Sequence, residues 1–328
     1  MTQSTSPSPV RPRPAIGAAL SAFDWRQNII YIGFLIVFVV FAMTLSQKGF
    51  LSSTNLLNVF RQTAIISIMA VAMTFVIGAG HIDLSVGAVA GLSSVTTALA
   101  LGSWGLPLPA AVVVGLLTGL VVGVANGFLV AVVAIPSFLV TLGMLGIVNG
   151  SAQWLSNTAP IPIQDDTFTF IFGSGDIGPI PSLLIWTAVI FAIGHVVLRK
   201  TTYGRRVLAT GGNSVAARFS GVDTRLITFL VMTVMGLTAG LAGMLFAGRL
   251  HSGRFEFGAG AELSVIAAVI LGGTSLFGGR ATVIGTLLGS LMIGLINNGL
   301  TLASLPTSQQ FIVRGLIIIL AVALAKKR

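Results

Sequence analysis

Long apolar runs separated by short polar interruptions make up most of this chain. A bilayer crossing needs about 20 predominantly apolar residues, and runs of about that length recur along almost the whole sequence. The runs predict ten helices, near 29–46, 58–78, 84–102, 108–131, 137–155, 180–198, 226–248, 262–276, 281–300 and 309–325. We therefore expect an all-α integral membrane protein with about ten transmembrane helices.

The composition agrees with a membrane protein. Hydrophobic residues make up 55% of the 328 residues and charged residues only 8%, so one water-soluble core cannot contain the apolar surface. The third and eighth predicted helices are short or interrupted by glycine, which allows one of them to be a half helix. Residues 27–328 are expected to form a single transmembrane domain, after a Ser- and Pro-rich disordered tail at 1–26.

The net charge of +10 follows the expected topology. Basic residues gather at both ends of the chain and in segment 199–225, which places these parts in the cytoplasm by the positive-inside rule. Segment 156–179, with Asp165, Asp166 and Asp176, then faces outward. Because topology explains the basic residues, nucleic acid is not an expected partner.

Two stretches in the two halves of the chain resemble each other. GAGHIDLSVGAVAG at 78–91 aligns with GAGAELSVIAAV at 258–269, so Asp83 and Glu262 each stand directly before Leu-Ser-Val. Five helices separate equivalent elements, and an odd number means that the two copies enter the membrane in opposite directions. This predicts a 5+5 inverted repeat, which is a transporter architecture.

Asp83 and Glu262 admit two interpretations. An ionised carboxylate at membrane depth is costly unless it caps a helix, pairs or meets water. Each acid can accept hydrogen bonds from free N–H groups of the helix that follows it. The other interpretation places both acids, with Ser85, in a translocation path or gate.

Uncharged polar side chains inside the predicted helices also admit two interpretations. They can join neighbouring helices by hydrogen bonds, or they can line a path for a hydroxyl-rich solute. An ion path usually needs several embedded charges, and few are present. The candidate path residues of this kind are Asn126, Thr141, Asn297, Asn298 and Gln309.

Segment 199–225 is a polar stretch between two apolar helices, with a short helical core predicted at 214–219. Asn213 is a natural N-cap and Gly221 a natural stop. From its residues alone this stretch is either a solvated linker or a docking surface.

The sequence gives no sign of enzymatic chemistry. The pattern GxxxxGK[ST] does not occur, so ATP hydrolysis through a P-loop would have to come from a partner. GSGDIG at 173–178 matches a dinucleotide pattern only formally, because it lies in the outward loop without a βαβ unit. The chain has no cysteine and three scattered histidines, so we expect no metal site and no cofactor.

Several motifs resemble, over nearly the whole chain, the permease subunits of bacterial monosaccharide ABC importers. This group includes the ribose, xylose, arabinose, galactose and autoinducer-2 permeases. The motifs are GHIDLSVG at 80–87, IPSFLVTLG at 135–143, GGNSVAARFSGV at 211–222, ELSVIAAVILGGTSLFGGR at 262–280 and NNGL at 297–300. Two departures are His81, where glycine is usual, and Val215, which replaces a glutamate.

The resemblance implies an inner-membrane, multi-pass protein with both termini in the cytoplasm. It implies a second permease subunit, identical or paralogous, an ATP-binding partner and a periplasmic sugar-binding protein. It also implies that the short cytoplasmic helix is a coupling helix that docks on the ATPase. Its residues would be Asn213, Ser214, Val215, Ala216, Ala217, Arg218 and Gly221.

The resemblance leaves the transported sugar open. The rival interpretations are related ABC permeases for branched-chain amino acids or nucleosides, which carry other sequences where this chain has HIDLSVG. An ion-coupled secondary transporter would share the inverted repeat but would need no docking loop.

Overall fold

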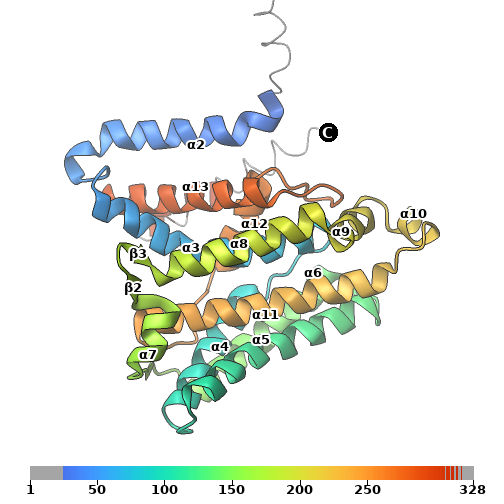
Figure 1. The fold of residues 1–328 in the computed structure, drawn as a ribbon, viewed down its shortest axis with the longest axis horizontal. Coiled ribbons are helices and arrows are strands. Elements are labelled where there is room, and N and C mark those ends of the chain that lie inside the picture. The colour runs from blue at the N-terminus through green and yellow to red at the C-terminus, as the bar shows by residue number, and fades with distance from the viewer. Residues whose placement is uncertain (1–24, 307, 311, 314, 317–318, 320–328) are drawn as a thin grey trace, which may run out of the picture.

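The computed structural model describes residues 25–306, 308–310, 312–313, 315–316 and 319. It is a bundle of long helices that lie side by side (Figure 1). The longer helices are α2 (Trp25–Thr44), α3 (Ser53–Gly78), α4 (Val86–Leu101), α5 (Leu108–Ala131), α6 (Ser137–Ser156), α8 (Ser182–Lys200), α11 (Thr224–Leu250) and α13 (Val283–Leu302), with α12 (Ala261–Leu271) much shorter. Most of the predicted tail 1–26 and much of the predicted helix 309–325 lie outside the described residues, and α2 already includes Trp25 and Arg26.

Among the described residues, six helices are long and apolar enough to cross a membrane: α3, α5, α6, α8, α11 and α13. The prediction of an all-α membrane protein is therefore confirmed. The bounds of α12 were predicted wrongly, because the helix ends at Leu271 rather than at 276. Gly272 and Gly273 follow, and Gly273 has a φ of 87°, a left-handed conformation that cannot continue an α-helix. With 11 residues, α12 is only about 16 Å long, whereas the hydrocarbon core is about 30 Å thick.

The smaller elements lie at the two ends of the bundle. One end carries β1 (Ile161–Pro162), α7 (Asp166–Thr169), the wide turn η2 (Phe170–Ser174), β2 (Asp176–Ile177), β3 (Ile180–Pro181) and β4 (Ser252–Gly253). β1 pairs with β4 and β2 with β3, both antiparallel. The other end carries α9 (Thr202–Gly212) and α10 (Ser214–Phe219), at the right of Figure 1. The short turn η1 (Ser46–Lys48) joins α2 to α3.

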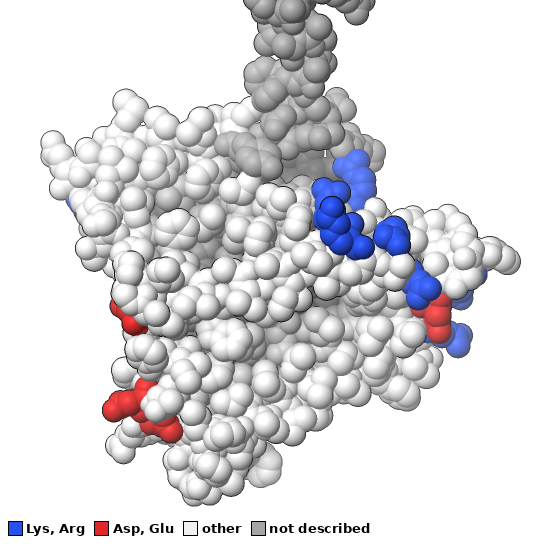
Figure 2. Space-filling view, viewed as in Figure 1, with Lys and Arg blue, Asp and Glu red and all other residues white. Residues whose placement is uncertain are grey.

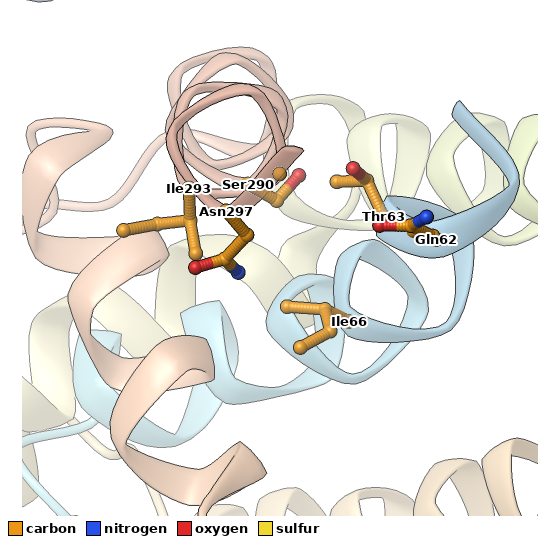
Figure 3. A pocket seen from close by; sticks show the side chains of 7 residues that line it. Gln62, Thr63, Ile66, Ser290, Ile293 and Asn297 are labelled. Atoms are coloured by element: carbon orange, nitrogen blue, oxygen red, sulfur yellow. The ribbon is translucent and has the colours of Figure 1, made fainter. Parts of the chain in front are cut away.

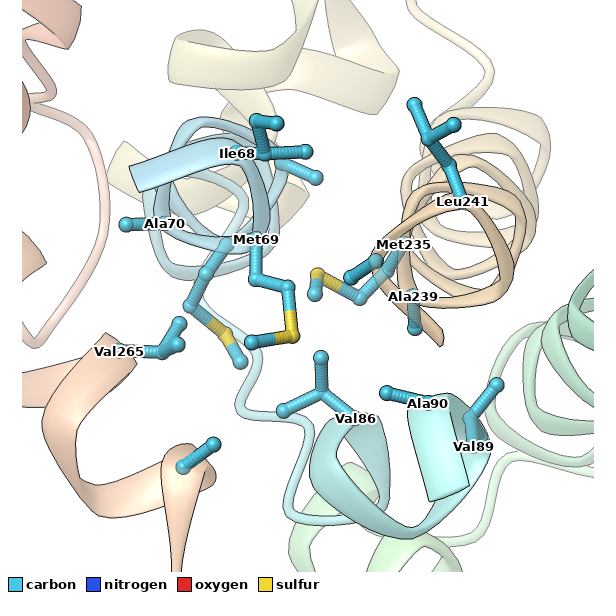
Figure 4. Close-up of a cluster of buried hydrophobic side chains, with 14 of the residues drawn as sticks. Ile68, Met69, Ala70, Val86, Val89, Ala90, Met235, Ala239, Leu241 and Val265 are labelled. Atoms are coloured by element: carbon cyan, nitrogen blue, oxygen red, sulfur yellow. The ribbon is translucent and has the colours of Figure 1, made fainter. Parts of the chain in front are cut away.

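The core lies where α3 and α11 cross the middle of the bundle. α3 packs against α11, α12 and α13, and α11 packs against α4 and α5. Met69, Met235, Val86 and Val265 meet there with little or no exposure (Figure 4). Unbranched methionines fill irregular gaps between helices well.

α5 shows why a sequence of this kind folds in lipid. Its residues Gly115, Gly119 and Gly123 are buried, while Val113 and Val121 are among the apolar side chains that are exposed. The small residues at four-residue spacing form one face of the helix, and large apolar residues form the opposite face. One face therefore packs closely against α11, and the other is suited to acyl chains.

Charged side chains separate between the two ends of the bundle. Figure 2 shows most of the visible basic side chains around the end that carries α9 and α10, with an acidic side chain among them, and further acidic side chains at the opposite end. There Nη2 of Arg61 in α3 lies 2.7 and 2.8 Å from the two carboxylate oxygens of Asp176 in β2. Arg61 is a basic residue on the acidic side, and this ion pair neutralises it.

Candidate functional site

The segment 79–85 between α3 and α4 is not helical, although it lies among the long helices. Its peptide groups are bound by the start of α6. Ser137 Oγ accepts the Ile82 N–H at 3.2 Å, and Thr141 Oγ1 lies 3.4 Å from the Ile82 carbonyl oxygen. Irregular backbone at membrane depth is tolerated where protein satisfies it. Two of the sequence motifs, GHIDLSVG and IPSFLVTLG, are therefore in direct contact.

His81 contacts a third helix from the same segment. Its Nε2 lies 3.0 Å from Thr228 Oγ1 in α11, and its side chain is half-buried. The residue that departs from the family pattern is therefore held by a hydroxyl of the central helix. Neither Ser137 nor Thr228 was among the predicted site residues, because each looked like an ordinary helix-surface hydroxyl in the sequence.

Asp83 is buried, with 1% exposure, and forms a hydrogen-bonded chain with Ser85 and Asn126. One carboxylate oxygen, Oδ1, accepts the Ser85 N–H at 2.8 Å and the Ser85 hydroxyl at 2.6 Å. Asn126 Nδ2 in α5 donates to Ser85 Oγ at 3.0 Å. Asn126 Oδ1 is buried and has no partner in the described part of the chain. The structure thus brings together three of the predicted residues at the start of α4.

Glu262 lies near the same end of α4, but its local role differs from that of Asp83. It stands inside the first turn of α12, whose N-cap is Gly260 and has no side-chain cap bond. A Cβ placed on Gly87 would lie only 2.7 Å from Glu262 Oε2 and would collide with the carbonyl oxygen of Gly258. The first turn of α4 therefore packs tightly against the segment that begins α12. Neither acid is the N-cap residue of its helix: Asp83 accepts the N–H of Ser85, which is itself the N-cap of α4, and Glu262 lies inside the first turn of α12.

Asn298 belongs to a set of polar pairs that join α3 to α13. The amides of Asn55 and Asn298 donate to each other at 3.1 and 2.9 Å. Further along, Ser67 bonds to Ser290 at 2.7 Å and Thr74 to Thr286 at 2.8 Å. We call these three pairs the polar ladder: Asn55–Asn298, Ser67–Ser290 and Thr74–Thr286.

The remaining two predicted path residues lie apart from Asp83. Asn297 lines a cavity of about 30 Å³ between α3 and α13, beside Gln62 and Ser290 (Figure 3). That volume suits a water molecule rather than a sugar. Gln309 is exposed, just past the end of α13. A larger groove of about 230 Å³ between α3, α8 and α13 is mostly apolar, and neither cavity is lined by Asp83 or Glu262.

The predicted cytoplasmic helix is present with its predicted ends. Asn213 Oδ1 accepts the Ala216 N–H at 3.0 Å, and Gly221 has a φ of 82°. Arg218 Nε donates to Thr224 Oγ1 at 2.9 Å, which ties α10 to the start of α11. Phe219 is 89% exposed.

α9, which precedes α10, was not among the predicted helices. The Thr201 hydroxyl accepts the Gly204 N–H at 3.2 Å and so caps this helix. The ring of Tyr203 stacks on Phe75 of α3 with ring centroids 6.3 Å apart. Burial raises the pKa of Tyr203 to about 12, so its phenol is neutral at physiological pH. A capping threonine before apolar residues at helical spacing was the signal that could have revealed α9.

Comparison with known proteins defines the class. Residues 55–322 match the family described as branched-chain amino acid transport system / permease component, and the chain belongs to this family. It is 40% identical over 299 residues to the probable ABC transporter permease protein YphD of Escherichia coli (strain K12), covering 90% of this chain and 89% of that protein. No solved structure matches the chain.

Relatives with named sugars are similarly close. The ribose import permease protein RbsC of Bacillus subtilis (strain 168) is 38% identical over 91% of this chain and 92% of its own length. The L-arabinose ABC transporter permease protein AraH of Azospirillum brasilense is 35% identical over 98% of this chain and 94% of its own. The chain is therefore a member of the monosaccharide ABC permease group, as its motifs indicated.

Proposed function

We propose that this chain is the transmembrane subunit of an ABC importer that moves a pentose or hexose across the bacterial inner membrane. The observation that carries the proposal is its identity of 35–38% to ribose and L-arabinose permeases over at least 91% of this chain. The side chains hydrogen-bonded in a chain with Asp83 are a hydroxyl, Ser85, and an amide, Asn126, groups that suit a hydroxyl-rich solute. ATP hydrolysis is assigned to a separate subunit, and a periplasmic binding protein delivers the sugar.

The orientation in this proposal follows from charge. Arg205, Arg206 and Arg218 are exposed at the end that carries α9 and α10, and Asp166 and Asp176 are exposed at the opposite end. The positive-inside rule assigns the first end to the cytoplasm. With ten crossings, both termini are cytoplasmic and segment 156–179 is periplasmic.

The proposed 5+5 inverted repeat is supported by reciprocal packing. The long helix α3 packs against α12 and α13, and the long helix α11 packs against α4 and α5. Each long helix is also followed by a non-helical segment and then a shorter helix, α4 after 79–85 and α12 after 251–260. Such pairs of interrupted helices mark the transport site in inverted-repeat transporters.

α10 is the proposed docking helix for the ATPase. Val215 and Phe219 lie four residues apart, on one face of the helix, and are 60% and 89% exposed. Arg218 in α10 and Arg225 at the start of α11 are also exposed. This surface fits an apolar socket with an acidic rim. Val215 contributes apolar contact where relatives are expected to carry a glutamate.

The mechanism is alternating access in a pair of permease subunits. ATP favours the closed arrangement of the ATPase, and only this difference in affinity can shift the membrane part between its states. The predicted path residues do not together line either of the two cavities described above. A path between two permease copies is consistent with that arrangement.

Uptake tests the proposal directly. Cells with and without this gene are given radiolabelled D-ribose, L-arabinose and D-xylose, before and after ATP depletion and after an uncoupler at constant ATP. Gene-dependent uptake that needs ATP and survives the uncoupler is expected. Uptake that collapses with the ion gradient alone would instead identify a secondary transporter.

Branched-chain amino acids are the second candidate substrate, because the family description names them. Labelled leucine in the same cells separates the two. Leucine uptake without sugar uptake would move the assignment, and failure of both would direct the search to nucleosides and autoinducer-2.

A further inference from the structure

Three separate parts of the chain meet backbone to backbone near the cytoplasmic end of the bundle. They are the end of α3 at Gly78, the end of α9 at Gly211, and the loop after α12 at Gly278 and Gly279. The Gly279 N–H donates to the Gly78 carbonyl oxygen at 3.1 Å. A Cβ on Gly211 would overlap that same oxygen and would lie 2.9 Å from the Gly279 nitrogen. We call this contact the glycine junction.

Side chains around the glycine junction hold α9 to α3. Val207 and Leu208 lie 3.7 and 3.5 Å from the point where a Gly78 Cβ would stand. Val207 is fully buried, and the Tyr203 ring stacks on Phe75 one turn before Gly78. α9 therefore cannot move away from α3 without opening a void in a packed interior.

The position of the glycine junction connects parts of the chain that are far apart in the fold. Gly211 is two residues from Asn213, the N-cap of the docking helix α10. Gly78 directly precedes segment 79–85, which contains Asp83. Gly278 and Gly279 belong to the loop 272–282, which joins α12 to α13. The junction is therefore adjacent to α10 and to both of these non-helical segments.

When two segments touch through their peptide backbones, a movement of one segment displaces the other by nearly the same distance. Side chains can change rotamer when a neighbour moves, but glycines have no side chain to absorb the movement. The Gly279–Gly78 hydrogen bond adds a directional constraint to this contact.

We propose that the glycine junction passes the movement of α10 to the segments 79–85 and 272–282, with Gly211 as its central positioning residue. This inference rests on the proposed function, because it assigns the route by which the ATPase acts on the membrane part. Closure of the ATPase moves α10 and α9 as one unit, and the junction moves both segments with them.

Two adjacent glycines supply a matched test. Gly211→Ala places a methyl group on the Gly78 carbonyl oxygen, whereas a Cβ on Gly212 has as its nearest neighbour the Gly279 Cα at 3.5 Å, an ordinary contact. Both positions are helical without a left-handed φ, so alanine strains neither backbone. The two variants therefore differ in whether the added methyl group pushes α9 away from the end of α3.

The measurement is the number of ATP molecules hydrolysed per sugar taken up. The complex, isolated from its own membranes with its ATPase and binding protein, is reconstituted in liposomes with the sugar that wild type transports. Gly211→Ala is expected to lower uptake about tenfold at unchanged ATP hydrolysis, a size typical of lost coupling. Gly212→Ala is expected to match wild type. Equal uptake by both variants, or a parallel loss of uptake and hydrolysis in Gly211→Ala, would overturn the proposal.

A cross-link tests the same idea without a steric change at Gly211. Leu208 and Ala281 both lie against Gly78, at 3.5 and 3.2 Å from the point where its Cβ would stand, and the chain has no native cysteine. Cysteines at both positions, joined by a short reducible linker, should leave uptake unchanged because the segments move together. Uptake blocked by the link and restored by reduction would show that they separate. Absence of any sugar uptake by wild type would instead refute the proposed function.

Discussion

The contacts α5–α11 and α3–α13 occupy equivalent places in the proposed inverted repeat, yet they are built from different residues. Between α5 and α11, Gly119 lies against the Gly236 carbonyl oxygen and Gly123 within 3.0 Å of the Gly236 Cα, both measured from the position of an added Cβ. Between α3 and α13, the polar ladder joins side chains. The first contact brings backbones together, and the second keeps them apart through hydroxyls and amides.

This difference assigns different mechanical roles to the two contacts. Glycine faces give a short interaxial distance and a fixed fit, because no side chain can rearrange. Hydroxyl pairs can exchange partners along a helix when it shifts, since each Ser or Thr also bonds to its own backbone. Ser67 Oγ, for example, lies 3.0 Å from the Thr63 carbonyl oxygen. We therefore expect α5–α11 to move as one body and α3–α13 to be the adjustable contact.

The largest expected effect comes from breaking the glycine contact. Gly119→Val puts branched carbons against the backbone of Gly236 and Gly240, and overpacking of this kind costs about 3 kcal/mol of the free energy of unfolding. Thermal unfolding in detergent and membrane abundance measure the loss. Gly146→Val is the control, because an added Cβ on Gly146 in α6 meets nothing within 4 Å. Equal stability of the two variants would contradict a close backbone contact.

Asp83 lies in segment 79–85, after α3 of the α3–α13 contact and before α4, which leads to α5 of the α5–α11 contact. Asp83→Leu removes the acceptor for two hydrogen bonds from Ser85, which costs about 2 kcal/mol when buried donors stay unpaired. Asp83→Asn keeps an acceptor oxygen and is expected to retain uptake of the transported sugar, measured per unit of membrane-inserted protein. Loss of uptake by Asp83→Asn at normal abundance would show that the charge itself acts in the path.

Removing one rung of the polar ladder should have a smaller effect. Ser67→Ala and Ser290→Ala each leave one hydroxyl without its cross-helix partner, while the double variant leaves neither. The coupling between them in a double-mutant cycle is expected to be about 0.6 kcal/mol, the average for such pairs inside membranes. A coupling near zero would mean that the two hydroxyls do not hold α3 to α13.

The smallest effect on the free energy of unfolding is expected in α10, which lies outside the α5–α11 and α3–α13 contacts. Val215→Glu restores the residue that relatives are expected to carry in α10, the proposed docking helix. Because Val215 is exposed, the free energy of unfolding should change by less than about 0.5 kcal/mol. Copurification of the ATPase with the two forms measures docking. A large loss of ATPase binding would confirm that the socket at this position is apolar.

Local features of this chain were predictable from its sequence. Asn213 and Gly221 bound α10 as expected, because a capping amide and a left-handed glycine are decided by neighbours within a few residues. The apolar runs gave the positions of the long helices for the same reason. The early end of α12 was missed because an apolar run through Gly272 and Gly273 has the same hydropathy whether or not the helix continues.

Long-range pairing was not predictable from one sequence. Ser67 and Ser290 are separated by 223 positions, and nothing in either neighbourhood indicates which helix faces which. For Asn298 both a cross-helix hydrogen bond and a place in the path were open, and nothing in its neighbourhood indicated that Asn55 would be its partner. The glycine junction escaped notice because Gly78, Gly211 and Gly278 acquire meaning only when three chain segments meet. Helix formation is local, whereas the choice of partner depends on the whole bundle.

The ion pair between Arg61 and Asp176 has an electrical consequence for α3. A full charge that crosses a membrane potential of 100 mV changes its energy by about 2.3 kcal/mol. The pair as a whole carries no net charge, although each side chain is partly exposed. The voltage across the membrane therefore exerts no net force on this pair when α3 tilts. In the proposed importer, α3 can therefore respond to ATP without also responding to the membrane potential.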